Sequence, residues 1–111
     1  MNAHEAQEMA SAAQRAGLPL IEAFHYRFHR AIHRALDIVR TGHLGRLLKA
    51  RACFATQIAH GADELRWCAE QGGGAVMDLG CYPIHVLRTL LGEEPSVTSA
   101  RALYAHGVEA Q

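Results

Sequence analysis

Apolar residues recur at every third or fourth position in the first part of the chain, and this spacing predicts two helices. The first covers residues 3–16, where Asn2 followed by Glu5 has the pattern of a capping box and Gly17 is a residue that commonly ends a helix. The second covers residues 29–41 and is also followed by a glycine. Each helix would turn an apolar face towards a core.

A third helix is predicted for residues 74–91, and one of its faces is polar. Pro83 lies inside this helix. Because proline has no backbone N–H and its ring crowds the carbonyl four residues earlier, we expect a kink there or two abutting helices. The polar face consists of side chains that lie four, seven and eleven residues after the first one. Its members are Asp78, Tyr82, His85 and Thr89.

Short apolar or alternating segments between the helices predict β-strands. We expect strands at 18–26, 44–58 and 97–104, one or two helical turns within the less regular stretch 59–71, and a frayed end at 106–111. The order is then α-β-α-β-α-β, and the helices are long enough to cross over between parallel strands. The predicted fold is α/β, a partial open mixed sheet with crossover helices.

Length and charge narrow the class of protein. The 111 residues suffice for one domain, and 11 basic residues balance 11 acidic ones. We see no basic stripe, so we expect neither nucleic acid nor a membrane surface as a partner. No apolar run approaches the roughly 20 residues of a membrane span.

The cysteines favour a reducing compartment. Cys53, Cys68 and Cys81 are odd in number and form no C-x-x-C pair, which argues against a disulfide framework or a zinc knuckle. The first residues have neither a basic segment nor an apolar segment of the kind found in signal peptides. We therefore expect a cytoplasmic protein.

Two other groups of residues have a functional and a structural interpretation. His25, His29 and His33 are spaced by four, which would suit a metal, but His25 falls on a predicted strand, so we favour polar surface positions and expect no metal site. The glycines at 72–74 could hold an anion at a helix N-terminus, yet they match neither G-x-G-x-x-G nor a P-loop, and we favour close packing.

The polar face of the third helix is the candidate for chemistry. Asp78, Tyr82 and His85 could form a proton-transfer site, although a phenol ordinarily titrates near ~10 and needs a nearby cation to act as a base at neutral pH. The alternative is a solvated face with Asp78 placed favourably near the helix N-terminus. Spacing alone favours that alternative.

Residues 72–82, GGGAVMDLGCY, change this balance. They are similar to the G-G-G-x-x-x-D-x-G-x-[HY] signature of the Gfo/Idh/MocA oxidoreductases. Residues 22–29 resemble that family's segment leaving the cofactor domain, and residues 36–46 resemble its helix followed by a G-x-L-G turn. Residues 5–17 resemble the helix that follows the family's E-K-P motif. The resemblance covers essentially the whole chain.

The resemblance implies a fold and an activity. Full-length members have a Rossmann domain followed by an α/β domain with an open sheet, and they transfer hydride between NAD or NADP and a carbinol carbon, often of a sugar or polyol. Residues 1–28 would be a helix and strand from the end of the cofactor-domain region. Residues 29–111 would be the start of the C-terminal substrate domain, a partial substrate and oligomerisation domain.

The resemblance also implies roles for single residues. Tyr82 stands where the sugar-oxidoreductase and dihydrodiol-dehydrogenase branch has its tyrosine, so it would be the general acid/base on the substrate hydroxyl, with Asp78 fixing it. Arg27, His85, Gly73 and Gly74 would belong to the substrate-binding side of the site. The expected small-molecule partner is a sugar, a polyol or a dihydrodiol.

The chain also departs from the family pattern. The E-K-P lysine and the Rossmann fingerprint are absent from these residues, and Arg30 stands where the family usually has proline. We therefore expect a fragment of the oxidoreductase that binds no NAD or NADP alone and is not competent alone. The alternative is a non-catalytic remnant or subunit-interaction module that forms a homo-oligomer through its sheet.

Overall fold

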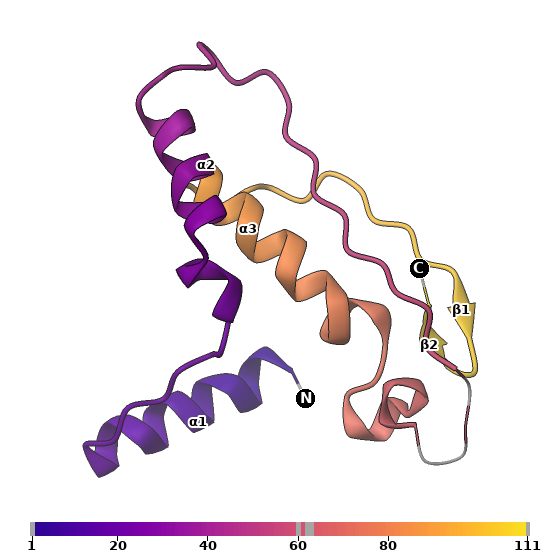
Figure 1. Cartoon of the computed structure of the whole chain (residues 1–111). Coiled ribbons are helices and arrows are strands. Elements are labelled where there is room, and N and C mark those ends of the chain that lie inside the picture. Colours follow the sequence, from indigo (N-terminus) through magenta and orange to yellow (C-terminus); the bar gives the residue numbers. More distant parts are fainter. Residues whose placement is uncertain (1, 60, 62–63, 111) are drawn as a thin grey trace.

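Helix α1 (Ala3–Ala16) is built as the sequence predicts. The computed structural model describes residues 2–59, 61 and 64–110. The Asn2 side chain accepts a hydrogen bond from the Glu5 N–H at 3.1 Å, and the Glu5 carboxylate accepts one from the Asn2 N–H at 2.9 Å, so the capping box is confirmed. Gly17 ends the helix with φ of 67°. Helix α1 lies apart from the other two long helices (Figure 1).

The prediction of a strand at 18–26 is wrong. Residues 18–24 have no regular secondary structure, and a short 3-10 helix, η1 (His25–Phe28), follows them. The Phe24 N–H donates to the Glu22 carbonyl and the His25 N–H donates to the Ala23 carbonyl, at 2.9 and 2.7 Å. These bonds join residues two apart, so they turn the chain locally where a strand would bond to a neighbouring strand.

Helix α2 (Arg30–Arg40) confirms the second predicted helix and is one residue shorter at each end. The His29 side chain caps it by accepting from the Ala31 N–H at 3.2 Å. The strand predicted at 44–58 is absent from the described residues. Its apolar and polar residues alternate as in a strand, but the described part of the chain forms no hydrogen-bonded ladder with it, and a strand is defined by that pairing.

The stretch before the third helix forms two turns of 3-10 helix, η2 (Leu65–Trp67) and η3 (Ala69–Gln71), as predicted. The third helix is divided into a π-helical turn, η4 (Val76–Gly80), and α3 (Cys81–Leu91). Pro83 is the third residue of α3, and η4 runs into α3 without a break, because Gly80 and Cys81 both have right-handed helical backbone angles. The expected interruption near Pro83 therefore takes the form of a π-helical turn just before it, within one continuous helical run.

The end of the chain forms a β-hairpin that the sequence did not predict. Strands β1 (Tyr104–Ala105) and β2 (Val108–Glu109) pair antiparallel, in place of a strand at 97–104 and a frayed end. His106 and Gly107 connect them with φ of 54° and 85°, which is the geometry of a type I′ turn. Val108 is only 3% exposed, so the hairpin is anchored on the rest of the molecule.

The structure is compatible with an α/β class but does not confirm the alternating α-β-α-β-α-β order. Its described residues contain helices and one two-stranded antiparallel sheet. The radius of gyration is 16.9 Å, against about 13 Å for a compact domain of this length. No helix among the described residues has the length and apolar character needed to cross a membrane.

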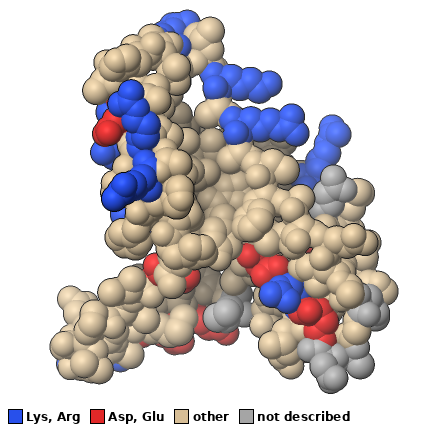
Figure 2. All heavy atoms as spheres, viewed as in Figure 1, with Lys and Arg blue, Asp and Glu red and all other residues tan. Residues whose placement is uncertain are grey.

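Basic and acidic residues are unevenly distributed, although their numbers are equal. Seven of the 11 basic residues lie between Arg27 and Arg51, together with Asp37 as the one acidic residue of that segment. Figure 2 shows most Lys and Arg side chains in the upper half of the molecule and most Asp and Glu side chains below them. The total charge alone therefore does not describe how the basic and acidic residues are distributed over the molecule.

Candidate functional site

The glycine run at 72–74 makes the tight connection between η3 and the third helix. Gly72 ends η3 with φ of 77°. The Gly73 N–H donates to the Cys68 carbonyl at 2.8 Å, and the Gly74 N–H donates to the Arg66 carbonyl at 2.9 Å. A Cβ on Gly73 would lie 2.7 Å from both of these carbonyl oxygens. Gly73 is thus required for close packing of backbone on backbone.

Gly74 is required for a second close approach. Its φ is 118°, and a Cβ there would lie 2.5–2.7 Å from the carboxylate of Glu109 on β2. That carboxylate accepts a hydrogen bond from the Val76 N–H at 3.3 Å, so it occupies the position at the start of η4 where an external anion would bind. The residues present therefore do not fit the pyrophosphate of a dinucleotide at the glycine run.

Asp78 lies on η4 and is held by an arginine. Its backbone N–H donates to the Gly74 carbonyl at 3.0 Å, and its Oδ2 lies 3.2 Å from the Arg66 Nε. The Arg66 Nη1 is also 3.0 Å from the Glu64 Oε1. Hydrogen bonds from Arg66 to Asp78 and then to Glu64 raise the pKa of the guanidinium above its usual range. One arginine thus bridges two carboxylates.

Arg66 and Glu64 are the part of the site that the sequence patterns did not single out. The chain places Arg66 beside Asp78 because the 3-10 turns and the glycine run fold η2 back on η4. The available signal was an arginine six residues before a glycine run that precedes an aspartate. Their spacing of 12 residues matches no helical or strand period, so it could not show the contact.

Tyr82 is the second residue of α3, and aromatic rings surround it. Its ring centroid lies 5.3 Å from that of Phe54 and 5.5 Å from that of Phe24, both edge to face. Asp78 and Tyr82 line one open hollow of about 390 Å³, which we call the Asp78 hollow. Its lining consists of Phe54, 56–59, Glu64, Arg66, Asp78, Leu79 and Tyr82. A hollow of this size can accommodate a monosaccharide or a diol.

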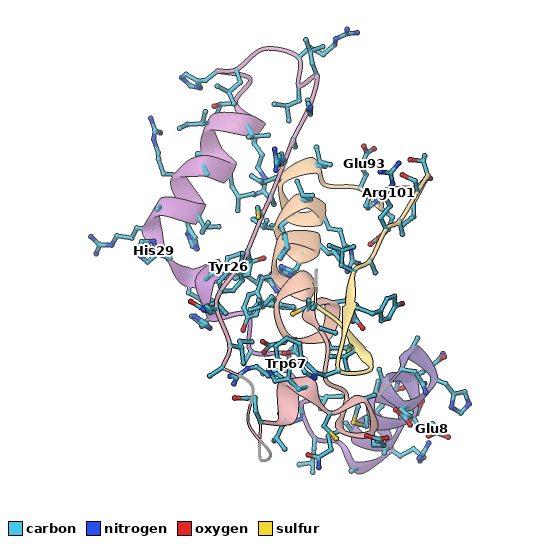
Figure 3. All side chains as sticks on the ribbon, turned by 90° about the vertical axis from the view of Figure 1, so that its right-hand side faces the viewer. Glu8, Tyr26, His29, Trp67, Glu93 and Arg101 are labelled. Carbon is cyan, nitrogen blue, oxygen red and sulfur yellow. The ribbon has the colours of Figure 1, made fainter. Side chains whose placement is uncertain are left out.

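His85 lies one helical turn after Tyr82 on α3, and both rings contact Phe24. Its Nδ1 is hydrogen-bonded to the Tyr26 hydroxyl, its ring stacks on Phe24 with centroids 4.1 Å apart, and Tyr26 lies where the η1 segment meets α3 (Figure 3). Burial, followed by the positive charges of Arg27 and Arg88, holds the pKa of His85 below its ordinary value. This pair fastens η1 to α3, and His85 does not line the Asp78 hollow.

Burial likewise raises the pKa of Tyr26, and the charge of Arg27 partly offsets this. Arg27 itself is exposed and does not line the Asp78 hollow. The structure therefore brings Asp78 and Tyr82 together, with Gly73 and Gly74 supporting the turn before them. It places Arg27 and His85 elsewhere, and substrate contact by these two residues stays a prediction.

The histidines at 25, 29 and 33 have separate partners. His29 caps α2, and the His33 Nε2 lies 2.7 Å from the Arg27 carbonyl oxygen. The His25 ring is edge-on to Tyr82, with centroids 6.4 Å apart. Across the described ranges, no three His, Cys, Asp or Glu side chains are grouped closely enough to hold a metal ion.

Comparison with known proteins matches this chain to one family of oxidoreductases. Residues 32–111 match the family model described as the GFO/IDH/MocA C-terminal domain. The chain is 40% identical to D-xylose 1-dehydrogenase (NADP(+)) 2 of Haloferax volcanii over 77 residues, which is 69% of this chain and 23% of that protein. No solved structure is similar enough to count as a match.

Two further relatives are similar over a larger share of the chain. Trans-1,2-dihydrobenzene-1,2-diol dehydrogenase of Macaca fuscata fuscata is 36% identical over 92 residues, 83% of this chain and 27% of that protein. The dTDP-3,4-didehydro-2,6-dideoxy-alpha-D-glucose 3-reductase of Streptomyces violaceoruber is 35% identical over 88 residues, 79% of this chain and 25% of that protein. The chain spans about a quarter of the length of these relatives.

Proposed function

Because the chain belongs to the GFO/IDH/MocA family, we propose that it is the substrate-binding part of an oxidoreductase that moves hydride between NAD or NADP and a hydroxyl-bearing carbon. The substrate is a sugar, a polyol or a dihydrodiol, as the names of the three relatives suggest. The observation that supports this most directly is the Asp78 hollow, where a carboxylate and a phenol from one helix face the same space.

Tyr82 gives or takes the proton of the substrate hydroxyl in this proposal. Asp78 orients that hydroxyl by accepting a hydrogen bond, and Arg66 keeps the Asp78 carboxylate in one position. The aromatic rings around Tyr82 limit the rotation of its side chain and exclude water from one side of the phenol. In this proposal the glycine run holds no part of the nucleotide, since Glu109 fills the anion position there.

A chimaera tests the proposal. The chain replaces the matching segment of the Haloferax volcanii D-xylose dehydrogenase, and the reduction of NADP⁺ by D-xylose is measured. We expect Tyr82→Phe to lower kcat by about 10²–10⁴-fold, the usual contribution of a general acid/base. Tyr104→Phe is the matched control, because Tyr104 is exposed on β1. Equal activity of the two variants in an active chimaera would refute the role of Tyr82.

The alternative function, a subunit-interaction module, has an observation of its own. Residues 48–52 alternate apolar and polar side chains within the stretch 44–58, which forms no ladder within the described structure, and Leu48 is 80% exposed. Unpaired extended chain with apolar side chains tends to pair with another chain, here a second copy. Light scattering would then show a concentration-dependent dimer that Leu48→Lys weakens and Val97→Lys does not. A monomer at all concentrations excludes this alternative.

A further inference from the structure

The Asp78 hollow has an unusual charge arrangement. Arg66 donates to Asp78 through Nε and to Glu64 through Nη1, and its backbone N–H donates to the same Glu64 oxygen at 3.2 Å. The side chains of Glu64 and Asp78 are 27% and 26% exposed, whereas that of Arg66 is 50% exposed. The two carboxylates are therefore held in place, each with part of its surface open to the hollow.

The charges do not balance. Among the described lining residues, the ionised groups are two carboxylates and one guanidinium, which leaves a net charge of −1. The remaining polar lining includes the neutral side chains of Thr56, Gln57 and Tyr82. Arg66 is already paired with two carboxylates, so the lining offers an incoming anion no surplus of positive charge.

We propose that the Asp78 hollow selects uncharged polyhydroxylated substrates and rejects sugar acids and sugar phosphates, and that Glu64 determines this specificity. Two neighbouring hydroxyl groups of the substrate donate to the oxygens of Asp78 and Glu64, which Arg66 holds side by side. An anionic substrate would place its charge next to these two carboxylates. This inference rests on the proposed function, since it concerns the substrate of the same site.

The experiment uses the whole 111-residue chain and its single tryptophan. Trp67 follows Arg66 in sequence and lines the adjoining hollow together with Arg66 and Asp78, so its fluorescence reports a ligand beside the pair. The chain is titrated with D-xylose and with D-xylonate, which differ in charge, at neutral pH and low ionic strength. We expect D-xylose to bind at least tenfold more tightly.

Glu64→Gln tests the specificity residue. This change removes one negative charge and leaves Arg66 paired with Asp78 alone, so the preference for D-xylose should fall at least threefold. Glu94→Gln is the matched control, because it breaks the Arg88–Glu94 pair outside the hollow. It should leave the preference unchanged. Far-UV circular dichroism confirms that both variants stay folded.

Three results would overturn the inference. D-xylonate could bind as tightly as D-xylose, Glu64→Gln could leave the preference unchanged, or neither ligand could change the fluorescence or the NMR spectrum of the chain. Failure of the proposed function looks different. In that case D-xylose binds with the expected preference, while Tyr82→Phe has no effect in the active chimaera.

Discussion

Substitution of the glycines at 72–74 separates packing from ligand binding at the site. A Cβ on Gly73 would lie 2.7 Å from the carbonyl oxygens of Arg66 and Cys68 and 2.8 Å from the Cys68 nitrogen. All three are backbone atoms that cannot move aside as a flexible side chain can. Gly73→Ala must therefore open the turn and stretch the two hydrogen bonds that close it.

The magnitude follows from these contacts. Overpacking a close-packed site costs about 1–3 kcal/mol. Two weakened backbone hydrogen bonds add about 0.5–1.5 kcal/mol each. The free energy of unfolding should therefore fall by about 2–6 kcal/mol, a large share of the roughly 5–15 kcal/mol that stabilises a typical domain.

The neighbouring glycines supply graded controls. At Gly74 the nearest atoms belong to the Glu109 side chain, which can move, so Gly74→Ala pays mainly for the φ of 118°, about 1–3 kcal/mol. At Gly80 the nearest atom is 3.4 Å away, an ordinary contact, and alanine is the better helix former by up to ~1 kcal/mol. Gly80→Ala should therefore be neutral or stabilising.

Urea unfolding followed by far-UV circular dichroism ranks the three variants. Hydrogen exchange at the Val76 amide reports the Glu109 contact separately, and this contact should be lost in Gly74→Ala. The reasoning is refuted if Gly73→Ala is as stable as Gly80→Ala. A stable Gly73→Ala variant that had lost only its sugar binding would show that Gly73 serves the ligand and not the fold.

Three further predictions follow from single contacts. The pKa of His85 lies below its ordinary value of about 6.5, so as the pH drops the unfolded chain takes up the proton before the folded chain does, and stability falls as the pH drops through ~6.5. Arg27→Gln removes a positive charge near His85 and should raise this pKa in an NMR titration, whereas a lowered pKa would contradict the prediction. Val108→Ala removes about two methylene equivalents from a buried site and should cost about 1.5–2 kcal/mol in urea unfolding, while a cost near zero would mean that the hairpin is not anchored. Asn2→Ala should destabilise α1 by about 0.5–2 kcal/mol, seen as faster exchange of the Glu5 amide, with no change in α3, and equal effects on both helices would refute this.

The helices could be predicted because their determinants are local. Hydrogen bonds four residues apart, the Asn2 cap and the glycine that ends α1 are all visible within a short window of sequence. The strands predicted at 18–26 and 44–58 did not form, since a side-chain pattern alone does not make a strand, which also needs a neighbour to pair with. The hairpin was missed because His106–Gly107 is not one of the familiar turn pairs.

The candidate site likewise combines residues that a local pattern predicts with contacts that it does not predict. Asp78 and Tyr82 could be singled out from one helix and from the family signature, and the structure places both in one hollow. The Arg66–Asp78 pair and the Glu109–Val76 bond connect residues 12 and 33 positions apart, through turns whose geometry no periodic pattern describes. Those contacts determine the charge and the accessibility of the site, so the sequence alone could not predict its selectivity.

The unpaired stretch 44–58 also determines how the chain would respond to a protease. It is largely exposed and contains Arg46, Lys49 and Arg51, and trypsin can cut the peptide bond that follows each of them. A cut there severs the covalent link between α2 and α3 while leaving the contacts of Phe24 and Tyr26 with α3 in place. Whether the two pieces separate after nicking would then measure the strength of that aromatic cluster directly.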